Sequence, residues 1–366
     1  MASRSITLAA AIFSTLSPGA LAQLFTVNCA PLTVQRADPI VNPGVLSSHV
    51  HVASGGTAFA LDESNERARA ANATTCDKNL DKSNYWQPQL YHIRTDGRFE
   101  IVPNEGNAVY YIDRACDFVA GRTNCANTPH AKAPPAGLRM TTGDPNLRTE
   151  TNNLPTTQCD TIRAQTFFPS CWDGVNLDSP NHQSHMAFPA IGDYNTGVCP
   201  ESHPVAILSV FYEFFYKTGA INGFNRLVWS TGDTTGFGLH GDFLNGWSDQ
   251  GALDRAIGTC TGPQGVTDPG CSLNVGPNGP GRSSSQVVEV APPNEDVGLN
   301  GPLDRLPGNN PVTDQATGQA PSQAPSQAPS QAPSQTTDQS TSQATSQDNQ
   351  DNQDNQDDQA DFFDFN

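Results

Sequence analysis

The chain has 366 residues and a net charge of −18, with 15% charged residues. Nine aspartates lie in residues 311–366, a stretch without Lys, Arg or Glu, so half of the net charge belongs to this tail. An acidic chain of this kind is a poor candidate for binding nucleic acid or an anionic membrane surface.

The first 22 residues predict a signal peptide. Arg4 supplies a positive start, an apolar run covers residues 6–16, and Ala20-Leu21-Ala22 matches a small-x-small cleavage site. The run is too short to span a bilayer, and nothing later reads as a transmembrane helix. We therefore expect a secreted, extracellular protein without a transmembrane segment. The sequon Asn72-Ala73-Thr74 fits this route and predicts a glycoprotein with a surface loop there.

Composition divides the rest of the chain into three parts. Residues 23–275 have the length of one domain, and no linker interrupts them. Residues 276–319 are rich in Gly and Pro and predict a linker. Residues 320–366 contain four Ala-Pro-Ser-Gln repeats and then Asp-Asn-Gln repeats. Such sequence buries too little apolar surface to offset chain entropy, so we predict a disordered, low-complexity, acidic tail.

Within the domain, strand patterns dominate. In chain order, a short helical pattern covers residues 61–71, strand patterns cover 108–112, 205–216 and 227–229, and a second helical pattern covers 252–257. The strand segments are β-branched or aromatic and are bounded by Gly, Pro and Asn. We predict a mainly β fold: a single antiparallel β-sandwich, jelly-roll-like, with long loops.

Nine cysteines follow the predicted cleavage site. In an oxidising compartment most of them should pair, and an odd number leaves at least one free or intermolecular. None of the spacings matches a zinc knuckle, so disulfide bracing is the better interpretation. The sequence does not fix the connectivity.

The first candidate site residues are His49 and His51. They alternate with Val50 and Val52, which suits a strand that turns both imidazoles to one side and the valines to the core. We predict that they bind a divalent metal or take part in catalysis. The alternative is a pair of hydrogen-bonded histidines at a polar edge. The sequence argues against a cupin site, which would place a glutamate four or five residues after the second histidine, because the first acid here is Asp62.

Two further polar segments extend this candidate site. His182 and His185 lie three apart in a loop-like segment, a spacing compatible with one shared metal. His240 and Asp242 lie two apart, so an extended backbone would place them on one face. A carboxylate beside an imidazole can fix its tautomer and raise its basicity. We predict catalytic roles for all four, against the alternatives of a plain loop and a Gly-rich turn.

Two common motifs do not apply. Residues 236–241 match G-x-G-x-x-G, but the sequence that follows is a poor helix start, so a dinucleotide site is rejected. No G-x-S-x-G elbow is present, which argues against a typical serine hydrolase.

Aromatic residues beside polar ones suggest a carbohydrate surface. Such rings can stack on a sugar while the polar neighbours bind its hydroxyls. An arginine in the same region could bind a carboxylate or phosphate on a ligand. The alternative is that the rings belong to the core and the arginine to an ion pair. The predicted substrate-binding residues are Tyr85, Trp86, Arg139, Trp172 and Asp173.

The ordered motifs of the chain resemble those of a secreted, mainly fungal family catalogued as domain of unknown function nineteen ninety-six. The resemblance covers about residues 38–260. It rests on Ala37–Gly44 leading into Ser47–His51, Ser83–Tyr91, Pro135–Met140, Phe168–Ser179 leading into Ser184–Pro189, Cys199–Val205 and Thr235–Phe243. It implies one extracellular domain, often followed by low-complexity or wall-binding sequence, and no particular activity.

Taken together, the sequence predicts an extracellular or cell-wall-associated protein with a His/Asp site. One hypothesis is an enzyme that acts on an extracellular polysaccharide and uses the His/Asp site as metal ligands or as general acid and base. The other is a non-catalytic wall, matrix or metal-binding protein. Convergence of the histidine segments in the fold distinguishes a common site from scattered structural histidines.

Overall fold

The computed structural model describes residues 23–142, 154–193, 196–274 and 287–313. All of these residues belong to one unit that spans Met1–Ala320. The predicted signal peptide and the predicted acidic tail lie outside the described residues. The same is true of the parts of the predicted linker before 287 and after 313.

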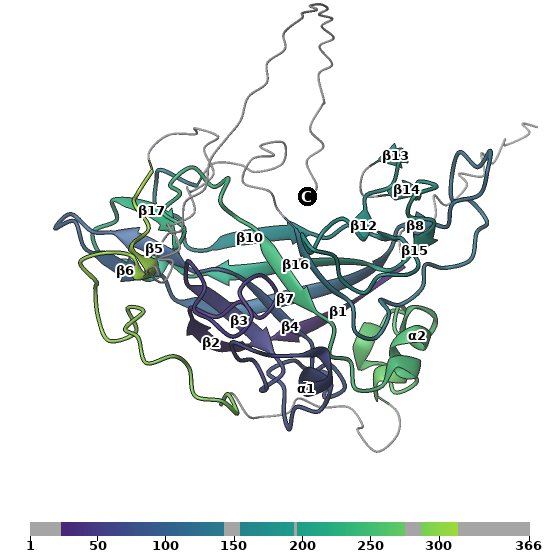
Figure 1. Ribbon diagram of the computed structural model, residues 1–366, viewed down its shortest axis with the longest axis horizontal. Coiled ribbons are helices and arrows are strands. Elements are labelled where there is room, and N and C mark those ends of the chain that lie inside the picture. Colours follow the sequence, from purple (N-terminus) through teal and green to yellow (C-terminus); the bar gives the residue numbers. More distant parts are fainter. Residues whose placement is uncertain (1–22, 143–153, 194–195, 275–286, 314–366) are drawn as a thin grey trace, which may run out of the picture. The chain divides into compact units, whose positions relative to one another are not determined.

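Two antiparallel sheets form the body of this unit (Figure 1). The first has the order β1 (Gln23–Cys29), β7 (Asn104–Asp113), β16 (Ser209–Tyr216), β10 (Ile162–Phe167). The second has the order β2 (Pro31–Gln35), β3 (His51–Gly55), β4 (Asn84–Pro88), β18 (Gly241–Leu244), β9 (Arg139–Thr142).

Three smaller sheets and a few short helices complete the unit. The sheets have the orders β17 (Arg226–Trp229), β5 (Leu90–Ile93), β6 (Phe99–Ile101); β12 (Met186–Ala187), β11 (Cys171–Trp172), β15 (Val205–Ala206); and β13 (Ile191–Asp193), β14 (Thr196–Val198), β8 (Ala115–Cys116). The α-helices are α1 (Asn65–Arg69) and α2 (Gln250–Thr259). The 3₁₀ turns are η1 (Thr218–Ala220), η2 (Gly265–Thr267), η3 (Ser272–Asn274) and η4 (Pro307–Asn309).

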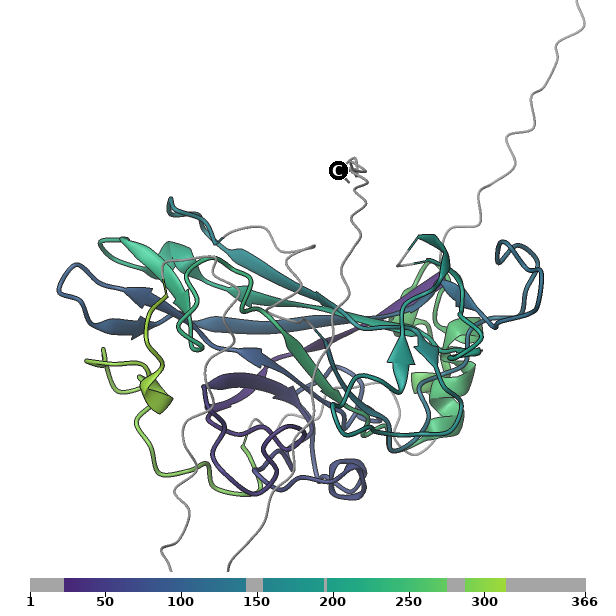
Figure 2. The same ribbon diagram turned by 45° about the horizontal axis from the view of Figure 1, so that its top comes forward.

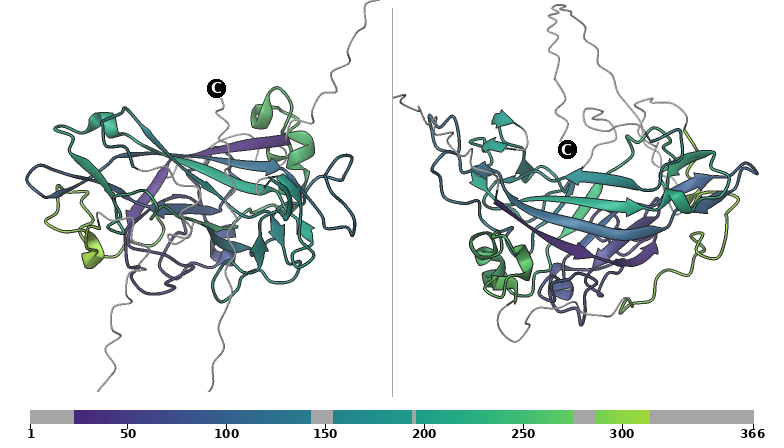
Figure 3. Two further views of the ribbon diagram at one scale, coloured as in Figure 1. Left: turned by 90° about the horizontal axis from the view of Figure 1, so that it is seen from above. Right: turned by 180° about the vertical axis from the view of Figure 1, so that it is seen from behind.

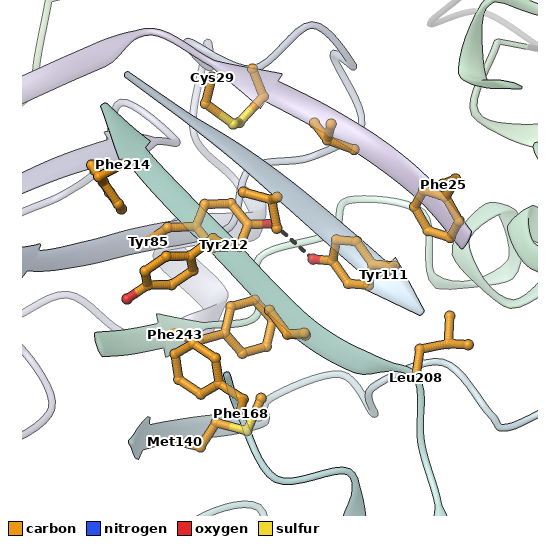
Figure 4. Close-up of a cluster of buried hydrophobic side chains, with 14 of the residues drawn as sticks. Phe25, Cys29, Tyr85, Tyr111, Met140, Phe168, Leu208, Tyr212, Phe214 and Phe243 are labelled. Carbon is orange, nitrogen blue, oxygen red and sulfur yellow. Dashed lines mark hydrogen bonds between the residues drawn. A yellow bond between two sulfur atoms is a disulfide. The ribbon is translucent and has the colours of Figure 1, made fainter. Parts of the chain in front are cut away.

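The two large sheets share one core (Figure 4). On β1, the side chains that alternate inward are Phe25, Val27 and Cys29, as the period of a strand requires. Phe25 stacks on Tyr111 of β7 with ring centroids 5.0 Å apart. From the other sheet, Tyr85 of β4 meets Tyr111 through a 2.7 Å hydrogen bond between their hydroxyls, the dashed line of Figure 4. This face-to-face packing is that of a β-sandwich.

Disulfides tie the loops to this core. Eight of the nine cysteines pair, and Cys159 is free and exposed. The bonded pairs are Cys29–Cys76, Cys116–Cys125, Cys171–Cys199 and Cys260–Cys271. The prediction of disulfide bracing with one cysteine left over is confirmed.

Residues 287–313 pack against the domain, although they fall within the predicted linker. Figures 2 and 3 show this yellow-green segment running along the lower edge of the sheets and then beside β5 and β6. Phe99 of β6 forms a bridge with Leu303, and the Tyr91 hydroxyl donates to the Val297 carbonyl at 2.8 Å. Leu306 is buried in a small cluster with Tyr91 and Val228.

The predicted fold class is confirmed: the unit is mainly β, its sheets are mostly antiparallel, and disulfides brace it. The predicted strand over 205–216 is divided, because β15 pairs with β11 whereas β16 pairs with β7 and β10. The chain therefore changes sheets at Ile207 and Leu208. Among the described residues, no helix is long and apolar enough to cross a membrane.

Candidate functional site

Strand register brings two of the candidate histidines together. His51 opens β3 and pairs with Pro88 at the end of β4. On the other side of β4, Asp242 of β18 pairs with Trp86, so the same register continued by two residues places His240 beside Pro88 as well. His51 and His240 thus flank one position of the sheet, although 189 residues separate them (240 − 51).

His49 completes a cluster of three imidazoles, which we call the histidine cluster (His49, His51 and His240). The ring centroids of His49 and His51 are 4.2 Å apart, and the His240 ring lies 4.9 Å from His49 and 5.7 Å from His51. One ring nitrogen from each residue lies within 4.8 Å of the others. The Nε2 atoms of His49 and His240 are 3.1 Å apart.

The remaining ring nitrogens are held by oxygen atoms. His51 Nδ1 donates to the Ala37 carbonyl at 3.0 Å, and His240 Nδ1 donates to the Gly238 carbonyl at 3.0 Å. Because a carbonyl only accepts, both neutral rings carry their proton on Nδ1 and present the Nε2 lone pair to the cluster. His49 Nδ1 lies 3.0 Å from the Ser48 hydroxyl, which can donate or accept.

Burial keeps these imidazoles neutral. It lowers the pKa of His51 well below the usual value, and the neighbouring His240 lowers it further. Burial likewise lowers the pKa of His49 well below its usual value, with additional repulsion from His51, His240 and Arg36. The pKa of His240 falls to about 4 for the same principal reason, burial. The cluster therefore holds three uncharged nitrogen donors at neutral pH.

Access to the cluster is one-sided. His51 is fully buried, and its Nε2 has no hydrogen-bond partner. His49 and His240 retain partial exposure. Val50 and Val52 are fully buried on the opposite side of the chain, as the alternation of the sequence predicted. A group bound by the three Nε2 atoms would rest on His51 and be reached from the side of His49 and His240.

Asp242 lies on the same sheet face but does not orient His240, because the Gly238 carbonyl does so. The predicted role of Asp242 in fixing the imidazole tautomer is therefore wrong. Burial raises the pKa of Asp242 well above its usual value, and repulsion from Asp38 adds to this. Burial also raises the pKa of Asp38, which backbone hydrogen bonds and nearby His182 partly oppose. Two buried carboxyl groups thus lie within electrostatic range of each other.

The other predicted histidines do not join the histidine cluster. His182 Nδ1 lies 2.7 Å from Asp178 Oδ1, and its side chain belongs to the loop that faces Asp38. His185 is buried, with Nε2 donating to the Arg139 carbonyl and Nδ1 beside the Ser179 hydroxyl. Both nitrogens of His185 are therefore used to hold its own loop.

Arg139 also binds protein groups. Its Nε and Nη2 donate to Asn65 Oδ1 at 3.3 and 3.2 Å, and its Nε lies 4.0 Å from Asp178. This arginine therefore joins α1 to the 178–185 loop, and its guanidinium is directed at protein groups rather than at a ligand.

The predicted aromatic sugar platforms divide into two groups. Tyr85 and Trp86 are fully buried, so neither ring can offer a face to a ligand, and that part of the prediction is corrected. Both lie in a strand that is covered on both sides. Trp172 is partly exposed and lines a cavity of about 850 Å³. Asp173 uses both carboxylate oxygens within its own turn, on Val175 and Asn176.

A second group with suitable donor atoms is present among the described residues, Cys29 with Cys76 and Asp81. Its sulfurs are joined in a disulfide, which leaves one carboxylate and no thiolate. The histidine cluster is therefore the better candidate metal centre.

Sequence reasoning missed the groups that orient the imidazoles. Two are the carbonyl oxygens of Ala37 and Gly238, which carry no side-chain signal. It also missed Asp38, which lies in the first motif of the family resemblance, Ala37–Gly44, and is only 3% exposed. The hydroxyl of Ser48, directly before His49, was the one orienting group that the sequence displays.

A family model described as Domain of unknown function (DUF1996) matches residues 38–247. No curated protein and no solved structure matches the chain. The matched range contains all three residues of the histidine cluster.

Proposed function

The chain belongs to the family described as Domain of unknown function (DUF1996), and because that description assigns no activity, we propose a function from the histidine cluster itself. The protein binds one divalent transition metal ion, zinc or copper, through the Nε2 atoms of His49, His51 and His240.

The observation that carries this proposal is the orientation of the rings. Carbonyl groups hold Nδ1 of His51 and of His240, so both Nε2 lone pairs face the cluster. This arrangement of an outer oxygen, an imidazole and a free Nε2 is the one that metal-binding histidines use. For His51, a buried Nε2 without a partner is costly unless something binds it.

The hydrogen-bond partners of His49 are compatible with both a metal-free and a metal-bound state. Without a metal, its Nε2–H can donate to His240 Nε2 at 3.1 Å while Nδ1 accepts from Ser48. With a metal, the ring changes tautomer and donates from Nδ1 to the Ser48 hydroxyl. The serine hydroxyl serves both states because it can donate and accept.

The donor set restricts the metal. Three neutral nitrogen donors suit Zn²⁺ and Cu²⁺ better than Mg²⁺ or Ca²⁺, which prefer oxygen ligands. Three protein ligands leave a fourth position of a tetrahedral ion for water or a substrate. His49 and His240 are the partly exposed residues of the cluster, so this fourth position would lie on their side. The site thus has the donors of a reactive metal centre rather than of a closed structural one.

We further propose that the protein works outside the cell. Four disulfides support an oxidising compartment. The exposed position of Asn72 is compatible with glycosylation at the sequon.

Metal binding is tested by loading the metal-free protein with Zn²⁺ and measuring affinity by calorimetry. Wild type should bind one ion, and His51→Ala and His240→Ala should each weaken binding by at least about 100-fold, since each removes a ligand. His130→Ala is the matched control, because His130 lies outside the cluster and bonds Asp113. Equal affinity in wild type and H51A, or no binding by wild type, would reject the proposal.

A polysaccharide ligand is a second candidate function, favoured by Trp172. Its indole Nε1 donates to the Asn176 carbonyl at 2.6 Å, which fixes the ring at the wall of the cavity of about 850 Å³. Gln250 and Arg255 line the same cavity and offer donors for hydroxyl groups.

This candidate is tested by affinity electrophoresis in gels that contain soluble cell-wall glycans. A retarded wild type and an unretarded Trp172→Ala would support it. His203→Ala is the control, because His203 is partly exposed and lies outside the cavity lining. A substitution of Trp229 would not serve, since this tryptophan is buried. Equal mobility of wild type and W172A on every glycan removes this candidate and leaves the metal proposal untouched.

A further inference from the structure

The segment after the family match reaches the loops that carry the histidine cluster. The match ends at residue 247, whereas residues 306–313 contact both the chain just before His49 and the loop 230–234 that leads to His240. We call residues 306–313 the C-terminal strap.

Asn310 joins the two loops directly. Its side-chain amide donates to the Ser48 carbonyl and to the Ser230 carbonyl, both at 2.9 Å. Ser230 in turn donates from its hydroxyl to the Val50 carbonyl at 2.6 Å. The peptide group before His49 and the peptide group before His51 are thereby fixed through one asparagine and one serine.

Gly308 allows this close approach. Its φ is +83°, and a Cβ there would lie 2.1 Å from the Ser48 carbonyl oxygen. A residue with a side chain would push the strap away from Ser48 or strain the backbone. The strap therefore contacts the chain before His49 through two neighbouring features, a glycine backbone and an asparagine amide.

Other contacts hold the strap in place on either side. Thr313 N–H donates to the Gly232 carbonyl at 2.9 Å, and Thr313 forms a bridge with Asp233. Upstream, Glu295 forms a 2.8 Å ion pair with Arg36, whose Nη1 donates to the Ser47 carbonyl at 2.9 Å. The C-terminal segment thus contacts Arg36, Ser48 and Gly232 from three separate points.

We infer that Asn310 is a positioning residue of the histidine cluster, and that the C-terminal strap completes a metal site whose ligands all lie within the family match. This inference rests on the proposed metal binding. Asn310 touches no ligand atom of the cluster. It acts through the peptide groups of Ser48 and Ser230, which set where His49 stands relative to His51 and His240.

The test is Asn310→Asp, which keeps the size of the side chain and removes the amide donors. N310D should weaken Zn²⁺ binding about tenfold, in the range seen when outer partners of metal ligands are lost. It should also change the visible absorption spectrum of the Co²⁺-loaded protein, because His49 would no longer be fixed. Asn300→Asp is the matched control: Asn300 is an exposed asparagine of the same C-terminal segment, and its substitution adds the same charge.

A second measurement uses wild type alone and decides the matter if N310D fails to fold. If the strap and the metal site are coupled, Zn²⁺ must stabilise the strap in return. Amide hydrogen exchange at Thr313, whose N–H donates to Gly232, should slow on addition of Zn²⁺.

The outcomes separate this inference from the proposed function. If wild type binds Zn²⁺ and H51A does not, but N310D matches N300D in affinity and Co²⁺ spectrum, the strap inference is overturned alone. Unchanged exchange at Thr313 on Zn²⁺ binding overturns it as well. Failure of wild type to bind Zn²⁺ overturns the proposed function, and the strap inference falls with it.

Discussion

At the scale of single residues, the role of a histidine here follows from the partner of its second nitrogen. His51 and His240 each give one N–H to a backbone carbonyl and keep the other nitrogen free to face the cluster. His185 has both nitrogens engaged, by the Arg139 carbonyl and the Ser179 hydroxyl. His51 and His240 can therefore bind a further group through a ring nitrogen, whereas His185 cannot.

Asp81 illustrates how burial changes a residue's behaviour with pH. It is fully buried, accepts from the Ser83 N–H and the Tyr85 hydroxyl, and has its pKa raised to about 6 by burial. Between its unfolded value of 3.8 and about 6, the folded protein holds a proton that the unfolded chain has released. Stability must therefore fall as pH rises through this window, and the contribution of the Asp81 proton is lost above about pH 6.

Asp81→Asn should remove this component. The free energy of unfolding of wild type, measured in urea from pH 4 to pH 7, should drop relative to that of D81N by about 2 kcal/mol. Asp254→Asn, at an exposed position, should follow the wild-type curve. Parallel curves for wild type and D81N would show that Asp81 ionises as easily in the folded protein as in the unfolded chain.

Sequence reasoning at this scale succeeded where the signal was a side-chain pattern. The alternation of His49 and His51 with two valines predicted the side to which each side chain points. It failed for Tyr85 and Trp86, because an aromatic residue beside polar ones reads alike on a surface and in a buried strand. Inside the protein, the side-chain amide of Asn84 donates to the Gly56 carbonyl at 2.9 Å rather than to a ligand.

At the scale of elements, the site depends on how the two large sheets are joined. The Tyr212 hydroxyl of β16 crosses the core, donates to the Trp86 carbonyl at 2.7 Å and accepts from the Asp242 N–H at 2.9 Å. Gly241 makes room for it, since a Cβ there would lie 2.3 Å from this hydroxyl. One tyrosine of the first sheet thus ties β4 to β18, directly beside His240.

Tyr212→Phe should be costly for that reason. It leaves a buried backbone N–H and a buried carbonyl without this partner, which should lower the free energy of unfolding by roughly 1–3 kcal/mol. Urea denaturation measures the loss. Tyr110→Phe is the matched control, because the Tyr110 hydroxyl donates to Glu213 on the outer, partly exposed face of the same sheet. If Y212F costs no more than Y110F, the hydroxyl does not join the sheets energetically.

The elements were predictable where a run of residues had one clear period. Residues 108–112 and 227–229 lie within β7 and β17, and residues 252–257 lie within α2. The pattern over 61–71 gives only the short α1, which begins after the Ser64 cap. The sequence did not predict which strands become neighbours. Strand pairing such as that of β3, β4 and β18 is set by contacts between segments that are distant in the chain.

At the scale of the whole molecule, the candidate site is assembled from widely spaced segments. The candidate ligands are His49, His51 and His240, the carbonyls that orient two of them belong to Ala37 and Gly238, and the strap comes from residues 306–313. The sequence predicted that three histidine segments would share one pocket. Residues 49–51 and His240 do meet, whereas His182 and His185 stay in their own loop. It treated the strap as part of a linker, because residues rich in Gly and Pro look alike in a linker and in a segment held by backbone contacts.

The central claim is that His49, His51 and His240 together hold one metal ion. X-ray absorption at the zinc edge of the Zn²⁺-loaded protein tests this most directly, since it counts and identifies the ligands. The account predicts three imidazole nitrogens at about 2.0–2.1 Å from the zinc in wild type. For any zinc that H240A still binds, it predicts two imidazole nitrogens. Sulfur or mainly carboxylate ligands in wild type, or an identical spectrum in H240A, would contradict it.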